Sequence, residues 1–446
     1  MKSNLLPLGV AMLALGLGAP PAALAQNVKP PKAQLWMDIS TGGMAGMPDM
    51  DSGVGAMIGG MMGGGNNTTY GQARGMSFMP PRVLDIALYN RLKPGVEAAQ
   101  LIPPGARMGD KLPLLPPPPA QPVKESEPTE VPEEYKRETP KGRILIYWGC
   151  GTEVRPGQPR IIDLARGNPA DFGAAFAGRY APDRGARVGP GYVLFPNERN
   201  RVSLSRESSL VGDHQIQGDG VPPSFRFTLG PPQDVMPAIE LQSSGSPKDS
   251  IALSWRAVNH ARAYFLHAMG SVGENDMVMW SSSEIPDSGM GLFDYLPNAT
   301  IDRWIKDKVL LTPETTQCAI PRGIFTAKDG GGRRDDSGGM LRMIAYGSES
   351  NFVHPPRPAD PKAVWEPDWS VRVRVKSSTM AMLGEERAGG RPGRGSRPGG
   401  SAPAGAAPAA GQDASAGQAA PASPSIGDVL SPLGNPANVL KGLFGR

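Results

Sequence analysis

The sequence predicts an all-β fold with two β-sandwich-like modules, long low-complexity loops and a disordered C-terminal tail. Segments in which polar and apolar residues alternate recur along most of the chain, as expected of strands with one buried face. The 446 residues include 58 Gly and 49 Pro, many of which separate these segments. Helical periodicity is nearly absent, and 301–305 is the one short helix predicted. Many short strands joined by Gly- and Pro-rich turns are typical of sandwiches.

The first predicted strands are too few to form a sheet alone. Strands at 34–40 and 83–89 precede a Pro- and Glu-rich segment at 112–140. Because two strands are only marginally stable in water, we expect them to pair with strands after residue 142. The segment 112–140 is then a solvated arm within the first module. The later predicted strands are 143–148, 192–195, 225–229, 238–242, 251–255, 263–268, 277–280, 308–311, 317–320, 341–346 and 370–376.

The last of these strands has a clear two-residue period. Its valines at 371, 373 and 375 alternate with Arg372, Arg374 and Lys376. Such alternation is typical of a strand with one face in the core and the other in water. The pattern therefore predicts buried valines and solvent-exposed cationic side chains.

Composition divides the chain into five ranges, and the boundary between the two modules lies near residue 245. The first module contains a Gly/Met loop at 42–65 and the Pro/Glu-rich arm at 112–140. The tail has almost no residues to bury, which predicts disorder. The ranges are a signal peptide at 1–25, a first β-rich module at 26–245, a second β-rich module at 246–385, a Gly/Arg/Pro/Ala tail at 386–424 and a short apolar docking segment at 425–446.

The first 25 residues have the form of a secretory signal peptide. Lys2 gives a positive start, an apolar run spans 5–17, and Ala23 and Ala25 are small residues before a cleavage site. This is the pattern of a removable export signal, and the apolar run is too short to persist as a membrane anchor. We therefore expect an exported protein of the periplasm or cell envelope, without a transmembrane anchor after cleavage.

The second module carries one family resemblance. The segment 251–255 (Ile-Ala-Leu-Ser-Trp) is followed by 261–268, which contains Tyr264, and then by a third apolar segment at 277–281. Over 251–283 the chain resembles consecutive strands of a fibronectin type III-like sandwich, in which a Trp on one strand packs against a Tyr on the next. The resemblance implies a fold, and such folds occur with many different functions.

The chain contains two cysteines, Cys150 and Cys318, each at the end of a predicted strand or within one. An even number of cysteines in an exported protein favours a disulfide. Two separate buried thiols are the alternative, because the sequence does not give the distance between them. A bridge would close a loop of about 169 residues, which the chain-entropy model values at about 5 kcal/mol of stability.

Three methionines, Met44, Met47 and Met50, are evenly spaced in the Gly/Met loop. Thioether sulfur is a soft ligand that selects Cu(I), and this spacing resembles that of exported copper-handling proteins. One hypothesis is therefore a periplasmic Cu(I)-handling protein with these residues as ligands. The alternative is a protein without a cofactor, in which adaptable Met side chains let the loop lie against an apolar surface or a partner.

The extreme C-terminus is apolar again after the low-complexity tail. An apolar segment at the end of a disordered tether has the design of a short docking peptide. We expect it to contact a protein partner in the cell envelope, or to fold back on its own chain. The candidate docking residues are Val429, Leu430, Leu433, Leu440, Leu443 and Phe444.

No catalytic motif stands out. The formal net charge of +4 is too small for the electrostatic footprint of a nucleic-acid-binding protein, and no Gly-x-Ser-x-Gly nucleophile motif is present. We therefore expect a non-catalytic binding or scaffold protein with no nucleic-acid partner. The second alternative is a hydrolase or carbohydrate-binding protein whose site is assembled from distant loops, with Trp365 and Trp369 as a candidate aromatic platform.

Overall fold

The computed structural model describes residues 28–45, 70–74, 82–118, 142–164, 178–273, 275–326, 339–360 and 362–383. Within these ranges β-strands predominate, and α3 (Asn298–Lys306) is the one α-helix. The prediction of an all-β fold is therefore confirmed. No helix in the described part of the chain is both long enough and apolar enough to cross a membrane.

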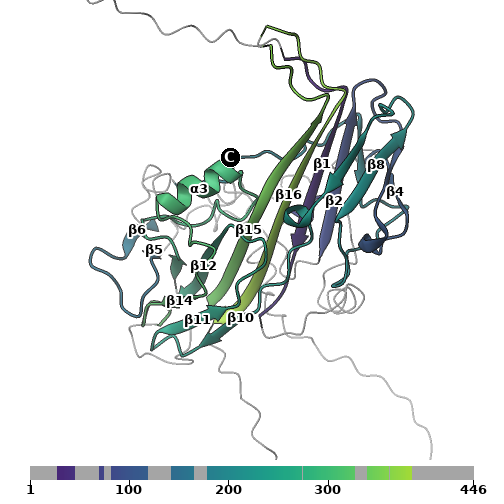
Figure 1. Cartoon of the computed structure of the whole chain (residues 1–446). Helices are drawn as coiled ribbons and strands as arrows, with labels where there is room; N and C mark the ends of the chain where they lie inside the picture. The colour runs from purple at the N-terminus through teal and green to yellow at the C-terminus, as the bar shows by residue number, and fades with distance from the viewer. Residues whose placement is uncertain are drawn as a thin grey trace, which may run out of the picture.

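The largest sheet has nine strands and runs through the whole described body (Figure 1). Its central strands, β15 and β16, are 16 and 15 residues long. From one edge to the other its strands are β6 (Arg160–Asp163), β5 (Arg143–Trp148), β13 (Asp276–Ser281), β12 (Ala263–Val272), β15 (Gly339–His354), β16 (Trp369–Leu383), β1 (Ala33–Thr41), β2 (Val83–Asn90) and β7 (Tyr192–Phe195).

Two smaller sheets accompany the large one. Figure 1 shows the four-stranded sheet beside β1 and β2. The three-stranded sheet lies near the lower end of β15 and β16 in the same view. The four-stranded sheet has the order β4 (Lys111–Leu114), β3 (Ala98–Leu101), β8 (Gly212–Gly218) and β9 (Arg226–Leu229). The three-stranded sheet has the order β10 (Leu241–Ser244), β11 (Ile251–Trp255) and β14 (Gln317–Ile320).

One face of the nine-stranded sheet, here called the core face, shares a hydrophobic core with both smaller sheets. Met37 of β1 and Val373 of β16 belong to the same buried cluster as Phe227 of β9 and Leu253 of β11. The alternation predicted for β1 and β16 explains this, because every second side chain of these strands is apolar and points to the core face. The opposite face, called the polar face, carries residues such as Asp38.

The β15–β16 hairpin has one irregularity, a shift in register between Tyr346 and Glu349. Gly347 lies within it, where an added Cβ would approach a methyl group of Val375 to 2.4 Å and the sulfur of Met236 to 2.7 Å. A residue with a side chain would therefore displace the packing at this position.

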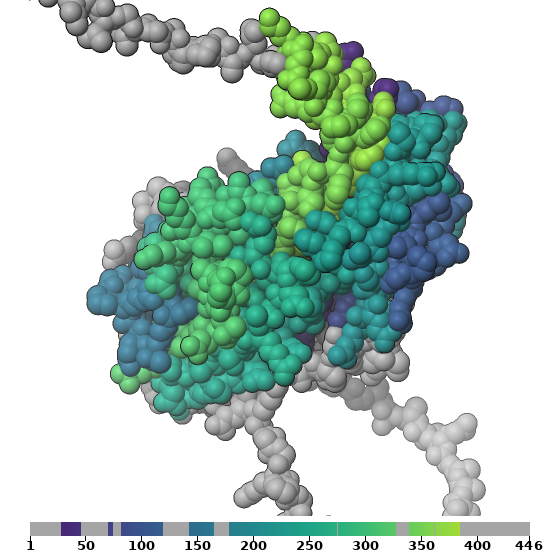
Figure 2. Space-filling view, in the orientation of Figure 1, coloured from purple at the N-terminus to yellow at the C-terminus, as the bar shows by residue number. Residues whose placement is uncertain are grey.

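The light green tip of the hairpin projects at the top of Figure 2, beside the purple start of the described chain.

The strands at the start of the chain pair with later strands, as expected. β1 pairs in parallel with β16 and antiparallel with β2, and β2 pairs with β7. The nine-stranded sheet thus interleaves strands from 26–245 with strands from 246–385. Before β1, the backbone N–H of Lys29 donates to the carbonyl of Trp365 at 2.9 Å, which fixes the start of the described chain to the hairpin.

The fibronectin type III-like resemblance implies a contact that the structure contains. β11 and β12 lie in different sheets, and the rings of Trp255 and Tyr264 meet edge to face with their centroids 5.6 Å apart. Tyr264 is fully buried, and its hydroxyl oxygen accepts a hydrogen bond from the backbone N–H of Val258 at 2.8 Å. The Trp–Tyr pair therefore joins the two sheets at this point.

Some predicted boundaries differ from the structure. The strand predicted at 308–311 is wrong, because Lys308 has a φ of 60° and the segment makes one isolated bridge, from Leu311 to Tyr264. The arm predicted from residue 112 begins with strand β4, whose Leu112 and Leu114 are buried. Strands β3, β6 and β8 were not predicted, since they are short or, in the case of β8, mostly polar in sequence.

Candidate functional site

The site residues predicted from the sequence fall partly outside the described chain. Met44 continues the line of β1 and forms a parallel bridge with Met380 of β16. Met47 and Met50 lie outside the described residues. So do the candidate docking residues of the C-terminus, which are Val429, Leu430, Leu433, Leu440, Leu443 and Phe444.

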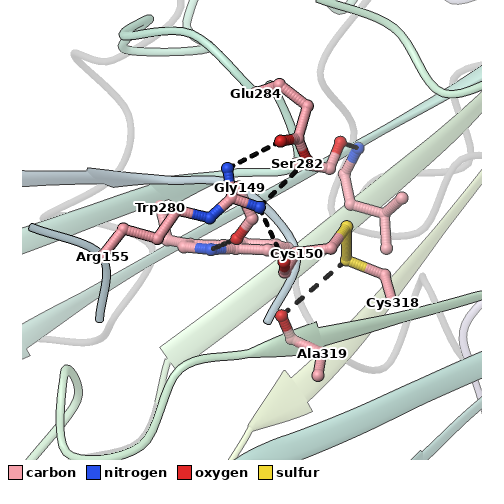
Figure 3. Close-up of a disulfide and its surroundings, with 9 residues drawn as sticks. Gly149, Cys150, Arg155, Trp280, Ser282, Glu284, Cys318 and Ala319 are labelled. Carbon is pink, nitrogen blue, oxygen red and sulfur yellow. Dashed lines mark hydrogen bonds and ion pairs between the residues drawn. A yellow bond between two sulfur atoms is a disulfide. The ribbon is translucent and has the colours of Figure 1, made fainter. Parts of the chain in front are cut away.

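Cys150 and Cys318 form a disulfide, with Cα atoms 5.1 Å apart (Figure 3). Cys150 follows β5 in the nine-stranded sheet and Cys318 lies on β14, so the bond joins the large sheet to the three-stranded sheet. Arg155 lies beside it and donates to the carbonyl of Cys150 at 2.9 Å and to Glu284 at 2.6 Å (Figure 3). The surroundings are those of a structural link between sheets.

The polar face of the nine-stranded sheet is buried at its centre. Arg374 is 1% exposed and Lys376 is 4% exposed, whereas Arg372 is half-buried. The prediction that these cationic side chains of β16 face water is therefore wrong. The cause is a cover of loop residues from 70–74, 178–187 and 287–295, which brings acidic and aromatic partners to this face.

Asp38 and Arg374 form the central ion pair of this face. β1 and β16 are parallel neighbours whose register places the two residues side by side. The Nε and Nη2 groups of Arg374 donate to the two carboxylate oxygens of Asp38 at 2.7 and 2.5 Å. The ring of Tyr295 lies 4.5 Å from the guanidinium carbon. A two-pronged pair of this kind offsets much of the cost of burying both charges.

Further arginine–carboxylate pairs fasten the covering loops. Gly185 comes so close that an added Cβ would lie 2.4 Å from the guanidinium of Arg74 and 2.9 Å from that of Arg374. A residue with a side chain at this position would therefore displace these guanidinium groups. The three pairs are Arg74–Asp294, Arg179–Asp287 and Arg184–Glu349, with N–O distances of 2.7, 3.0 and 3.1 Å.

Asp85 of β2 lies directly opposite Asp38 in the sheet. Its Oδ2 atom accepts hydrogen bonds from the backbone N–H groups of Gly71 and Ala73 at 3.0 and 2.8 Å, which holds 70–74 against the sheet. Burial, assisted by the negative charge of Asp38, raises the pKa of Asp85 to about 8. At pH 7 the two facing carboxyl groups therefore carry one negative charge between them.

An open pocket of about 410 Å³ lies on the polar face next to the Asp38–Arg374 pair. The register of β1, β2 and β7 places Gln34, Tyr89 and Tyr192 side by side. The ring of Tyr192 lies 5.8 Å from that of Trp36 and 5.0 Å from that of Tyr89. We call this hollow the aromatic–arginine pocket, and its lining is Gln34, Trp36, Tyr89, Asp183, Arg184, Gly185, Arg187, Tyr192 and Arg372.

The three arginines of this pocket differ in their partners. Arg184 pairs with Glu349, and the Nε group of Arg372 donates to the side-chain oxygen of Asn351 at 3.1 Å. Arg187 is exposed and forms no ion pair with any residue in the described ranges. The pocket therefore combines two positioned guanidinium groups with one that is open to an incoming anion.

A row of methionines crosses four neighbouring strands of the polar face. Directly paired residues on one face have Cβ atoms about 4.5–5.5 Å apart, so neighbouring thioethers can approach a common point. Two residues before Met382 on β16, Met380 bridges Met44. The row cannot be recognised in the sequence, because strand pairing assembles it from distant segments. Its members, each the Cα partner of the next, are Met279, Met269, Met340 and Met382.

The buried histidines are held in separate contacts. His214 contacts the side chain of Gln100 at 3.0 Å and the carbonyl of Leu210 at 2.8 Å. His267 lies opposite Arg342, and burial lowers the pKa of His267 to about 3. In the described ranges no three His, Cys, Asp or Glu residues are grouped so as to hold a metal ion.

The two tryptophans considered for an aromatic platform differ in environment. Trp369 is buried and stacks on Phe225 and on His354, with ring centroids 5.0 and 5.6 Å apart. Trp365 donates its indole N–H to the carbonyl of Pro355 at 3.1 Å. Trp369 thus serves the core at the hairpin end of the sheet.

No protein-family model matches this chain, and no curated protein and no solved structure is similar to it. The interpretation of the site therefore depends on its geometry and chemistry.

Proposed function

We propose that this chain is an exported, non-catalytic binding protein of the cell envelope that holds a protein partner. The observation that carries the proposal is the aromatic–arginine pocket, in which three aromatic rings and three arginines surround an open hollow. Tyr, Trp and Arg are the residues that most often dominate the binding energy at protein interfaces. A partner that inserts an apolar side chain flanked by a carboxylate would match both the rings and the charge.

Most side chains of this pocket are held in place by the sheet and by neighbouring residues. Tyr89 and Tyr192 project from paired strands, and Arg184 and Arg372 are already held by Glu349 and Asn351. Side chains fixed before binding lose little conformational entropy on association. Arg187, which forms no ion pair with the described residues, then supplies the charge that steers an acidic partner and fixes its position.

Affinity capture from the native envelope fraction tests this proposal. The mature protein should retain a partner that the Tyr192→Ala variant loses, because truncation of a central aromatic contact typically weakens binding tenfold or more. The matched control is Arg303→Ala on the exposed side of α3, which should capture as well as wild type. Equal capture by Tyr192→Ala and Arg303→Ala would show that the pocket is not the contact.

The apolar C-terminal segment would provide a second contact with the partner. A chain ending at Gly384 lacks the tail and its apolar docking residues but keeps every described strand. If the segment assists binding, this truncated chain should bind the identified partner more weakly, since a tethered second contact raises the overall affinity. An unchanged affinity would assign binding to the pocket alone.

A second candidate function is Cu(I) handling, and the methionine row on the polar face favours it. Met269, Met340 and Met382 are consecutive partners on three adjacent strands, and Met44 bridges Met380 beside them. Thioethers on neighbouring strands are suitable ligands for a soft monovalent cation. The row would then form a fixed part of the site that the Gly/Met loop was predicted to provide.

Competition with a Cu(I)-specific chromophoric chelator distinguishes this candidate. Wild type should withdraw Cu(I) from the chelator, and the Met340→Leu/Met382→Leu variant should withdraw less, because leucine keeps the volume and removes the sulfur. A third variant with Met44, Met47 and Met50 changed to Ser measures the share of the loop. Identical titrations for all three proteins would exclude Cu(I) binding by these methionines.

A further inference from the structure

A small enclosed cavity lies on the polar face, apart from the aromatic–arginine pocket. Its volume is about 20 Å³, which suffices for a single species of the size of a water molecule. Strands β1, β15 and β16 form its floor, and Gln72 and Phe293 from the covering loops complete it. Its lining is Ser40, Gln72, Phe293, Arg342, Met343, Ile344, Lys376, Ser378, Thr379 and Met380.

Two cations share this cavity and also share one neighbour, Phe293. The ammonium of Lys376 donates to the carbonyl of Phe293 at 3.3 Å, and the guanidinium carbon of Arg342 lies 4.0 Å from the Phe293 ring centroid. The Nη1 group of Arg342 is buried and has no hydrogen-bond partner within the described structure. Burial lowers the pKa of Lys376 to about 8, and the positive charge of Arg342 adds to this effect.

The carboxylates nearest to these cations are already engaged by other groups. Asp38 gives both oxygens to Arg374, and Oδ2 of Asp294 accepts two hydrogen bonds from Arg74, at 2.7 and 3.0 Å. The raised pKa of Asp85 keeps that carboxyl neutral at pH 7. The centre of the polar face therefore holds more buried positive charge than buried negative charge.

Neutral donors complete the lining. Ser40 and Ser378 add two hydroxyl side chains to the same cavity. A hydroxyl can turn its proton toward an anion, so the lining offers several donors to one small negative species.

We propose that this cavity binds a single halide ion, chloride in the cell, between Lys376 and Arg342. The ion offsets the surplus positive charge and ties the covering loops at Gln72 and Phe293 to β15 and β16. The cavity volume of about 20 Å³ favours a monatomic anion over a larger one. The site is independent of the partner-binding proposal, because the two hollows share no lining residue.

Thermal unfolding at constant sodium concentration tests the site. Replacing gluconate by chloride or bromide should raise the Tm of the mature protein along a saturating curve, because a ligand bound only by the folded state stabilises it. The Lys376→Met variant should lose this dependence. Lys29→Met, at an exposed lysine far from the cavity, should keep it. Equal Tm values for wild type in chloride and in gluconate would overturn the proposal.

Crystals of the mature protein grown in bromide provide a second readout that needs no variant. Anomalous scattering should show one bromide between Lys376 and Arg342. A cavity occupied only by water, with bromide absent or bound elsewhere, would contradict the proposal even if a general salt effect raised the Tm.

Discussion

Each buried ion pair of the polar face depends on both of its residues. Asp38 is 2% exposed, and its two oxygens are the direct partners of Arg374. Removing one member of such a pair leaves a buried charge without compensation, which is far more costly than removing both. The stability of the covering loops therefore depends on matched pairs more than on the number of charges.

Substitution of Asp38 measures this dependence. Asp38→Asn should lower the free energy of unfolding by about 3–5 kcal/mol, because Arg374 keeps its charge and loses its partner. The double variant Asp38→Leu/Arg374→Met removes both charges and should be clearly less destabilised than the single variant. Urea unfolding of the three proteins makes the comparison, and a double variant at least as unstable as Asp38→Asn would contradict it.

Asp85 gives the molecule a specific pH dependence. Its pKa is about 8 in the folded protein against a usual value of 3.8. Between these values the unfolded chain has lost the proton and the folded protein keeps it, so stability falls as pH rises. From pH 5 to pH 7 this amounts to about 2–3 kcal/mol, at 1.36 kcal/mol for each pH unit.

The Asp85→Asn variant removes this proton and keeps an oxygen for the N–H groups of Gly71 and Ala73. Its unfolding free energy should therefore change less between pH 5 and pH 7 than that of wild type. Chemical unfolding at the two pH values gives the difference directly. Parallel pH profiles for the two proteins would show that Asp85 ionises normally.

At the scale of elements, strand periodicity predicted most of the sheet but not what covers it. The alternation of polar and apolar residues in β1, β2 and β16 correctly predicts strands, and the valines of β16 face the core as expected. The same alternation wrongly predicts that Arg374 and Lys376 are exposed to solvent. Polar residues on one strand face indicate solvent only when nothing covers that face, and the acidic partners Asp38 and Asp294 come from segments distant in sequence.

The disulfide is the one covalent link between β14 and the edge of the nine-stranded sheet near β5. Replacing Cys150 and Cys318 by Ser should lower the unfolding free energy by about 2–5 kcal/mol, because the unfolded chain gains freedom when a long loop is released. Urea unfolding checks this, and a reducing agent should produce a similar loss in wild type. Equal unfolding midpoints for the oxidised protein and the variant would show that the disulfide does not stabilise the fold.

At the scale of the whole molecule, one sheet unites segments that composition separated. Composition predicts a module boundary near residue 245, and the sheet joins β1 to β16 and β5 to β13 across it. Register also creates the aromatic–arginine pocket, since Trp36, Tyr89, Tyr192 and Arg372 come from four strands spread over more than 300 residues. Their identities are visible in the sequence, but their proximity depends on pairings between distant strands.

The most direct test of the binding proposal is the affinity of the captured partner for the Arg187→Glu variant. Calorimetry at low and at physiological salt should give a dissociation constant at least tenfold above that of wild type, with the larger difference at low salt. The matched charge reversal Arg303→Glu should bind as wild type does. If Arg187→Glu binds as tightly as Arg303→Glu, the pocket is not the place where this protein holds its partner.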